Sequence, residues 1–235
     1  MDIAGLKILN AERRNRRAAI LLTDLETGSA RVIREGEPLE GDLAEAARKA
    51  FRTGTSGAVA LDGRQYFLNV TVPTPRLVVV GAVHISQALA PMAKIAGFDM
   101  EIIDPRTAFA TQERFPDVPL HAEWPEVVLA KRPLDAYSAL AAVTHDPKID
   151  DFAIKAALEA GCFYVGALGS RKTHAARVAR LTQAGVSEEA IARIHAPIGL
   201  NIGAVSPQEI AVAVLGQVVQ VFRARGAAVV RDAAA

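Results

Sequence analysis

Residues 76–106 constrain the fold more than any other part of this sequence. An apolar, β-branched run at residues 77–80 suits a strand buried on both faces, and Gly81 follows it as a tight turn. Apolar residues then recur at helical spacing, and a second apolar run at residues 100–103 ends in Asp104. A strand, a glycine turn, a helix and a second strand that ends in a carboxylate predict the opening unit of a dinucleotide-type Rossmann fold.

The turn after the first strand departs from the G-x-G-x-x-G pattern that binds a pyrophosphate in such folds. Val83 and Ser86 stand where that pattern has its second glycine and its last small residue. The second glycine lets the backbone approach the pyrophosphate, and the methyl groups of a valine occupy that space; a β-branched residue also resists a positive φ. The sequence therefore predicts the fold but disfavours NAD(P) bound in the ordinary way at Gly81. An NAD(P)-dependent oxidoreductase is the alternative function.

A Pro-Thr-Pro segment at residues 73–75 suits a short, extended linker between two domains. Residues 1–73 combine helical and alternating patterns with an Asp-Gly turn signal, and they predict a small α+β domain. Residues 76–228 alternate strands with helices, which predicts an α/β domain, a Rossmann-like parallel sheet with helices on both faces. Strands are expected at residues 77–80, 100–103, 118–121, 136–144 and 162–168, and helices at residues 149–160, 171–184, 187–194 and 207–225. Residues 229–235 are expected to form a disordered tail.

Composition excludes several classes of function. The formal net charge of +1 argues against a nucleic-acid or membrane-surface partner. No apolar run reaches the roughly 18 residues of a transmembrane helix, and the first residues do not resemble a signal peptide. A single cysteine, Cys162, excludes an internal disulfide, and its apolar surroundings predict a buried, inert thiol. We therefore expect a cytoplasmic protein.

In a parallel sheet of this kind, ligands bind beyond the carboxyl ends of the strands, and four polar groups follow predicted strand ends. In the first, Gly81 is followed by His84 and Ser86. A helix N-terminus favours a neutral His84, which can face a ligand or pack as an uncharged side chain. In the second, Asp104 can hydrogen-bond a ribose and Arg106 can bind a phosphate, or the two can form an ion pair.

The third group is a Thr-His-Asp-Pro turn that contains His145 and Asp146. An imidazole beside a carboxylate suits acid–base chemistry or metal binding, although aspartates at such positions also cap helices. Asp150 or Asp151 is expected to cap the helix that follows. The five histidines are too scattered to define a metal site, so no metal ligand is assigned.

The fourth group is the most informative because a strand ends in two glycines and a helix begins with polar and cationic residues: Gly166, Gly169, Ser170, Arg171 and Lys172. Backbone N–H groups, a hydroxyl and two cations at one helix N-terminus predict a site for an anion such as phosphate. The spacing differs from a Walker A motif, so nucleotide hydrolysis is not indicated.

A glycine-rich segment at residues 195–204 contains His195, Gly199 and Asn201 and leads into a helix with Ser206 as its predicted N-cap. A loop of this length between packed elements commonly folds over a site. His195, Gly199 and Asn201 are therefore added to the candidate binding residues.

These motifs resemble those of the xanthine dehydrogenase accessory proteins of the XdhC/CoxI type. The matching stretches lie in about the last two thirds of the chain and are GAVHISQALAPMAKIAGF, THDPKIDD, FYVGALGSRKTHAARVARL and IHAPIGLNIGAVSPQEIAVAVL. Many members carry a cysteine in a glycine-rich loop that corresponds to residues 36–41 here, where this chain has none.

The resemblance implies a maturation factor that binds the molybdenum cofactor, as molybdopterin or its cytidine dinucleotide form. Such a factor delivers the cofactor to a xanthine dehydrogenase or carbon monoxide dehydrogenase-type apoenzyme. It also implies a homodimer and a chaperone role without turnover, so no catalytic residue is assigned. The phosphate end of the cofactor would suit the anion site expected at residues 169–172.

Overall fold

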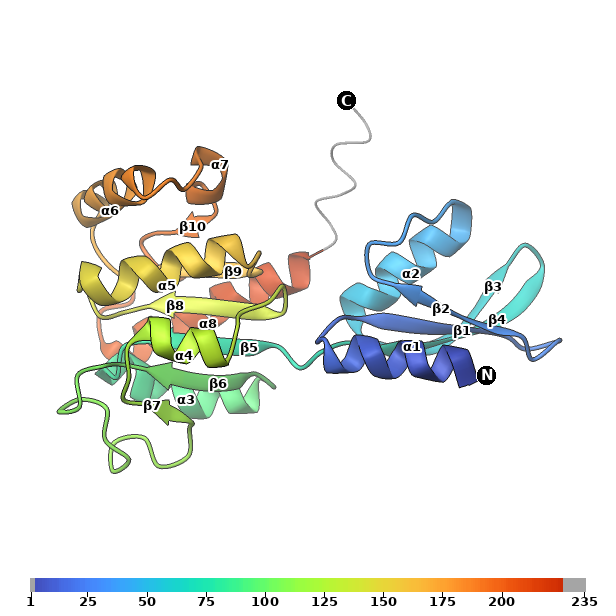
Figure 1. The fold of residues 1–235 in the computed structure, drawn as a ribbon, viewed down its shortest axis with the longest axis horizontal. Helices are drawn as coiled ribbons and strands as arrows, with labels where there is room; N and C mark the ends of the chain where they lie inside the picture. The colour runs from blue at the N-terminus through green and yellow to red at the C-terminus, as the bar shows by residue number, and fades with distance from the viewer. Residues whose placement is uncertain (1–2, 226–235) are drawn as a thin grey trace. The chain divides into compact units, whose positions relative to one another are not determined.

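The structure, a computed structural model, describes residues 3–225, which divide into two compact units. Of the described residues, one unit contains residues 3–73 and 223–225, and the other contains residues 74–222. Figure 1 shows the elements of each unit. The tail predicted at residues 229–235 lies outside the described residues.

The N-terminal unit is an antiparallel sheet with the strand order β2-β1-β4-β3. Its elements are α1 (Ile3–Arg14), β1 (Ala19–Asp24), β2 (Ala30–Arg34), α2 (Gly41–Thr53), β3 (Gly57–Leu61) and β4 (Arg64–Thr71). The β3–β4 hairpin turns at Asp62 and Gly63, with φ of 50° and 76°, the left-handed pair that an Asp-Gly signal predicts. The α2 residues Ala47 and Ala50 pack against a core that includes Ile20. This architecture agrees with the expected α+β fold.

The second unit contains a six-stranded, wholly parallel sheet with the order β10-β9-β8-β5-β6-β7. If the strands are renumbered 1 to 6 from β5 to β10 and the sheet is followed from β7 to β10, the order is 3-2-1-4-5-6. This is the strand order of a Rossmann fold. Its strands are β5 (Arg76–Val80), β6 (Asp99–Ile103), β7 (Leu120–His121), β8 (Ser138–Ala142), β9 (Tyr164–Ala167) and β10 (Ile194–His195). Its helices are α3 (His84–Ile95), α4 (Pro125–Lys131), α5 (Pro147–Glu159), α6 (Arg171–Gln183), α7 (Glu188–Ile191) and α8 (Pro207–Ala224).

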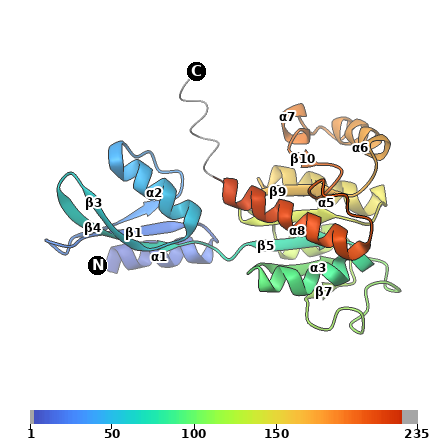
Figure 2. The ribbon, with the colours of Figure 1, turned by 180° about the vertical axis from the view of Figure 1, so that it is seen from behind.

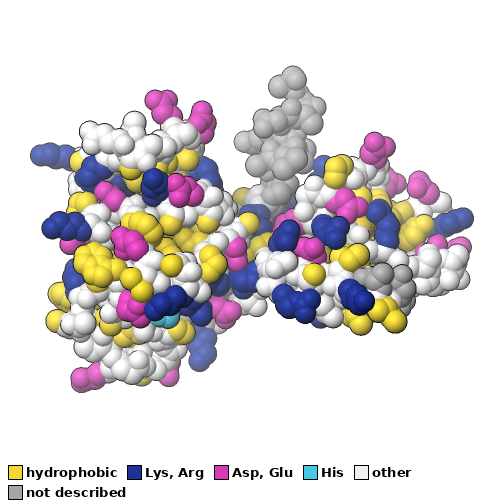
Figure 3. All heavy atoms as spheres, viewed as in Figure 1, with side chains coloured by type: hydrophobic (Ala, Val, Ile, Leu, Met, Phe, Trp, Pro, Cys, Tyr) yellow, Lys and Arg dark blue, Asp and Glu magenta, His cyan; other side chains and the backbone are white. Residues whose placement is uncertain are grey.

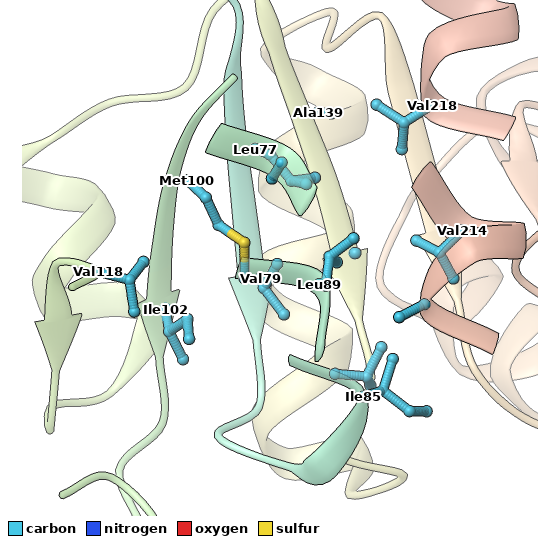
Figure 4. Packing of buried hydrophobic residues seen from close by; sticks show 14 of the residues in the cluster. Leu77, Val79, Ile85, Leu89, Met100, Ile102, Val118, Ala139, Val214 and Val218 are labelled. Carbon is cyan, nitrogen blue, oxygen red and sulfur yellow. The ribbon is translucent and has the colours of Figure 1, made fainter. Parts of the chain in front are cut away.

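Helices cover both faces of the parallel sheet, with α3 and α8 on one face and α4 and α5 on the other (Figures 1 and 2). Along β5 the side chains alternate: Leu77 and Val79 join the core under α3 and α8, and Val78 and Val80 join the core under α4 and α5. Figure 4 shows Leu77 and Val79 among the residues of the first core. Because both faces are buried, the strand is apolar at each position from Leu77 to Val80 instead of alternating with polar residues.

The sequence patterns missed two elements, and they predicted β7, β8, β9 and α7 to be longer than the structure shows. The short helix α4 and the two-residue strand β10 are too brief to produce a recognisable period. The helix expected at residues 187–194 is only Glu188–Ile191, since the chain then enters β10 beside β9. Ser206 accepts a hydrogen bond from Glu209 N, so its predicted N-cap role is confirmed, and Ser187 caps α7 by accepting from Ala190 N.

Within the described residues, the structure contains no helix with the length and apolar character needed to cross a membrane. On the face shown in Figure 3, cationic and anionic side chains are interspersed with hydrophobic ones.

Cys162 is fully buried, and burial raises the pKa of its thiol to about 12. A thiol in such surroundings stays protonated and is a poor nucleophile, as the sequence predicted.

Candidate functional site at the carboxyl edge of the parallel sheet

Three turns follow neighbouring strands and therefore lie side by side at the carboxyl edge of the sheet. They begin at Gly81 after β5, at Val143 after β8 and at Leu168 after β9, and β8 pairs with both β5 and β9. In the sheet, β6 lies on one side of β5 and β8 lies on the other side of β5. The position between β5 and β8 is thus the topological switch point, the place at which doubly wound sheets bind ligands.

The Gly81 turn needs glycine for packing against the neighbouring turn. Gly81 has a φ of 127°, and an added Cβ would lie 3.0 Å from side-chain carbons of Val143 and Thr144. Ser86 is completely buried, and its hydroxyl donates to the carbonyl of Gly81 at 2.6 Å, so it points into the turn. Val83 has a φ of −112° at the α3 N-cap, so the expected conflict between its branched side chain and a positive φ does not arise. His84 is exposed at the first position of α3.

Asp104 and Arg106 form an ion pair, which was one of the two arrangements expected. Asp104 is fully buried, and Arg106 donates Nε to Oδ1 at 2.9 Å and Nη2 to Oδ2 at 2.7 Å. The N–H of Ala82 donates to Oδ2 at 2.7 Å, so both carboxylate oxygens are occupied. Burial alone would raise the pKa of Asp104, but the bonds from Arg106 and from backbone N–H groups outweigh it and lower the pKa. A ribose could bind here only by displacing these donors.

The turn after β8 carries Asp146 as the N-cap of α5. Its Oδ1 accepts from Lys148 N at 2.9 Å. The expectation that Asp150 or Asp151 would cap this helix is wrong, because Pro147 starts the helix one residue after Asp146. His145 is exposed and has a φ of 65°, a conformation that costs a non-glycine residue about 1–3 kcal/mol and often occurs at functional sites.

The turn after β9 presents two cations to solvent. Ser170 is the N-cap of α6 and accepts from Thr173 N at 3.2 Å. Arg171 and Lys172 are exposed, and neither forms an ion pair with any residue between 3 and 225. Gly169 has a φ of 134°. Gly166, in contrast, is a packing residue, because an added Cβ would lie 2.5 Å from the Tyr164 hydroxyl and 2.7 Å from Ile198.

The glycine-rich segment is anchored on β9 and α8. His195 stacks on Tyr164 with ring centroids 4.9 Å apart, and burial lowers its pKa, so the imidazole is neutral at pH 7. Gly199 N and the Tyr164 hydroxyl both donate to Oε1 of Gln217, at 2.9 and 2.7 Å. Asn201 lies further along the segment and is exposed. His195 and Gly199 therefore shape the loop, whereas Asn201 remains available to a ligand.

The sequence patterns missed the roles of three polar residues that lie directly beneath the turns: Thr144, Asp150 and Arg177. Asp150 is 1% exposed and accepts from Thr144 Oγ1 at 2.7 Å. Arg177 is 2% exposed and donates Nη2 to the carbonyl of Leu168 at 3.0 Å. One signal could have identified Arg177: it lies four residues before Leu181, which is also buried, so a cation occupies an apolar position of α6.

Over residues 3–225, no three or more His, Cys, Asp or Glu side chains are grouped so that they could hold a metal ion. The edge is instead characterised by exposed imidazoles at His84 and His145 and by the exposed cations Arg171 and Lys172. Such an edge offers hydrogen-bond donors and positive charge to an anionic ligand.

The XdhC Rossmann domain family matches residues 77–218, which cover most of the second unit. Three curated proteins are similar to this chain. The uncharacterized protein YqeB of Escherichia coli (strain K12) is 34% identical over 197 residues, which are 82% of this chain and 35% of that protein. A probable subunit of xanthine dehydrogenase from Bacillus subtilis (strain 168) is 32% identical over 155 residues, 66% of this chain and 45% of that protein.

The third is the molybdenum cofactor insertion chaperone PaoD of E. coli (strain K12), 31% identical over 149 residues, which are 63% of this chain and 41% of PaoD. The chain thus spans between about a third and just under half of the length of these relatives. The crystal structure of a xanthine dehydrogenase from Bacillus halodurans has the same fold, with a TM-score of 0.63 and 24% identity, over 95% of this chain and 66% of that one.

Proposed function

Because this chain belongs to the XdhC family, we propose that it binds a molybdenum cofactor at the carboxyl edge of its parallel sheet and delivers it to a molybdoenzyme. The recipient would be an apoenzyme of the xanthine dehydrogenase or carbon monoxide dehydrogenase type. The names of two relatives, a cofactor insertion chaperone and a probable component of xanthine dehydrogenase, support an accessory role of this kind.

The observation that carries the proposal is the N-terminus of α6. The first helical turn of α6 begins with Arg171 and Lys172, whose backbone N–H groups hydrogen-bond to no acceptor within the described chain. Cations at a helix N-terminus are opposed by the helix dipole, which costs roughly 0.3–1 kcal/mol for each charge. An anion placed between them would remove this repulsion and accept from the N–H groups. Molybdopterin ends in a phosphate, and its cytidine dinucleotide form carries a pyrophosphate, so either form suits this turn.

The exposure of the site favours transfer over turnover. Arg171, Lys172, His84 and His145 are all exposed, so a bound cofactor would remain accessible to a recipient protein. Two carboxylates at this edge are already engaged, Asp104 by Arg106 and Asp146 by the first turn of α5, and a third, Asp150, is buried beneath the turns. A carrier that holds its cargo by a few exposed contacts can release it when the recipient supplies more of them.

The test is retention of the cofactor by the purified protein. We expect anaerobic co-expression with cofactor biosynthesis, followed by mass spectrometry, to detect a molybdopterin species bound to the wild-type chain. The double variant Arg171→Ala/Lys172→Ala should retain at most about a tenth as much, because it loses two charge-assisted contacts.

A matched control removes two cations from the opposite edge of the same sheet. Lys94 and Lys131 lie in the last turns of α3 and α4, and both are exposed. The double variant Lys94→Ala/Lys131→Ala makes the same change in net charge and should retain the cofactor. Equal retention by both double variants would remove the anion site from the proposal, and detection of NAD(P) in place of a pterin would favour the oxidoreductase alternative.

A further inference from the structure

A buried pair of opposite charges lies beneath the turns that follow β8 and β9. Asp150, on α5, is 1% exposed, and Arg177, on α6, is 2% exposed. Buried ions are expensive, since each loses several kcal/mol of hydration that only good geometry can offset. Replacement of such a pair by hydrophobic residues is often neutral or stabilising. Packing alone therefore does not explain why these two charges occupy the interior.

Asp150 holds the first turn through Thr144. The Thr144 hydroxyl donates to Asp150 Oδ1 at 2.7 Å and accepts from the N–H of Asp146 at 2.9 Å. These two bonds span the turn that places His145 in its left-handed conformation. Loss of the carboxylate would leave the Thr144 hydroxyl with only the distant carbonyl of Asp146, at 3.5 Å, as an acceptor.

Arg177 holds the second turn directly. Its Nη2 donates to the carbonyl of Leu168 at 3.0 Å, one residue before Gly169. The N–H of Leu168 in turn donates to the carbonyl of Ala142 at 2.8 Å, where β8 ends. The guanidinium therefore fixes the backbone from which Ser170, Arg171 and Lys172 follow.

Within the described chain the two side chains form no direct ion pair or hydrogen bond with each other, but their charges interact, and both are incompletely paired elsewhere. Arg177 lowers the pKa of Asp150, and Asp150 raises that of Arg177, in both cases against a larger effect of burial. Asp150 Oδ2 and the Nε and Nη1 atoms of Arg177 are buried and have no hydrogen-bond partner within the described chain. Their charges are thus screened by few other groups, and their mutual attraction acts in a medium of low polarity.

We propose that Asp150 and Arg177 are positioning residues whose attraction couples the β8–α5 turn to the β9–α6 turn, so that the two turns keep one relative placement. The relevance of this coupling to cofactor binding rests on the proposed function, which assigns the cofactor to these two turns. The coupling itself does not depend on a bound cofactor. Neither residue contacts the ligand in this arrangement.

The chain supplies a matched control on the same two helices. Asp151 and Arg180 also pair α5 with α6, through bonds of 2.5 and 3.1 Å, but both side chains are partly exposed and neither bonds to a turn. The substitutions Asp151→Ala and Arg180→Met therefore remove an ion pair between the same helices without touching Thr144 or Leu168.

Amide hydrogen exchange in the purified full chain measures the coupling without any cofactor. The N–H of Asp146 reports on the first turn and the N–H of Leu168 on the second, since both are hydrogen-bonded. At pH 7.5 we expect Arg177→Met to speed exchange at the remote Asp146, and Asp150→Ala to speed it at the remote Leu168, each about tenfold. The double control Asp151→Ala/Arg180→Met removes two charges whose effects on Arg177 are opposite, so it should change neither amide.

A pH comparison separates electrostatic coupling from general loosening. The groups that act on Asp150 are Thr144, Arg177 and Asp151, and Asp150 in turn acts on Arg106 at the end of β6. Burial raises the pKa of Asp150 to about 6, so the carboxyl is mostly neutral at pH 4.5. After correction for intrinsic exchange, the effect of Asp150→Asn on Leu168 should therefore be present at pH 7.5 and absent at pH 4.5.

The pattern of exchange rates across the variants either supports or overturns the proposed coupling. Faster exchange only in the turn that the substituted residue touches would overturn the coupling, as would an equal effect of the control pair. If Asp150→Ala does not fold, Asp150→Asn carries the same test, because it keeps an acceptor for Thr144 and removes only the charge. Coupling in a chain that retains no molybdopterin would refute the proposed function and leave the positioning pair intact.

Discussion

The substitution Glu101→Gln tests how much one buried carboxylate contributes to the Rossmann unit. Glu101, in β6, is 3% exposed. Its Oε1 accepts from Arg76 Nη2 at 2.5 Å, and its Oε2 accepts from Arg132 Nε at 2.8 Å and lies 3.0 Å from His121 Nε2. Glutamine preserves the shape of the side chain, removes the charge and replaces one acceptor oxygen by a donor.

The magnitude follows from how exposed each partner is. The Arg76 side chain is 10% exposed, so its pairing with Glu101 counts as buried, and breaking such a pair costs about 3–5 kcal/mol. The Arg132 side chain is 52% exposed, and its contribution is at most about 1 kcal/mol. The amide oxygen of glutamine can still accept one of these bonds. We therefore expect Glu101→Gln to lower the free energy of unfolding by about 3 kcal/mol, the lower end of that range.

Urea denaturation followed by tryptophan fluorescence is the suitable assay, because the single tryptophan, Trp124, lies in the unit of residues 74–222. Unfolding of the other unit then does not enter the signal. The control Glu123→Gln alters an exposed carboxylate paired with Lys131 and should change stability by less than about 1 kcal/mol. A Glu101→Gln effect no larger than that of Glu123→Gln would refute the argument.

The pH dependence has a defined sign. Burial alone would raise the pKa of Glu101, but hydrogen bonds and charges from Arg76 and Arg132 outweigh it and lower the pKa below its ordinary 4.5. A carboxyl with a lowered folded-state pKa contributes stability above the unfolded value, and this contribution is lost as the pH falls through the folded value. The difference between wild type and Glu101→Gln should therefore be full at pH 6–7 and shrink below about pH 4.5.

Two further predictions concern residues that pack against Tyr164. Gly166→Ala places a Cβ 2.5 Å from the Tyr164 hydroxyl and should lower the free energy of unfolding by about 1–3 kcal/mol. The control Gly161→Ala adds a Cβ that meets no neighbouring atom but imposes a φ of 69° on alanine, so it measures backbone strain without a clash. An equal loss in both variants would contradict the packing role of Gly166. His195, whose pKa is lowered by burial, should titrate below 6.5 in an NMR titration, and the stability it contributes should be lost as the pH falls through that pKa; a value at or above 6.5 would refute its burial against Tyr164.

Much of the architecture could be predicted because it depends on local patterns. The apolar run of β5, the Asp-Gly hairpin and the serine caps of α7 and α8 each depend on residues close together in the sequence. The missed elements, α4 and β10, are short and are stabilised by contacts with distant strands and helices. Short elements of this kind leave no period to detect.

The candidate site was harder to predict because composition does not reveal orientation. Ser86 and Gly166 occupy positions typical of ligand contacts, yet one donates into its own turn and the other makes room for Tyr164 and Ile198. Arg171 and Lys172 are exposed at a helix N-terminus as the sequence indicated. The contribution of any of these residues to cofactor binding stays a proposal until retention is measured.

Local sequence patterns are enough to predict most strands and helices in their order, apart from α4 and β10, and also the cluster of donors at the start of α6, since each is encoded by neighbouring residues. Which polar side chains are buried and hydrogen-bonded inside the protein depends instead on how the whole fold packs. Asp104 meets the N–H of Ala82, and Arg177 reaches Leu168 beside Asp150, across chain separations that no local pattern records. The physical reason is that burial and hydrogen bonding of a polar side chain depend on every element packed around it, whereas backbone preference depends mainly on its neighbours in the chain.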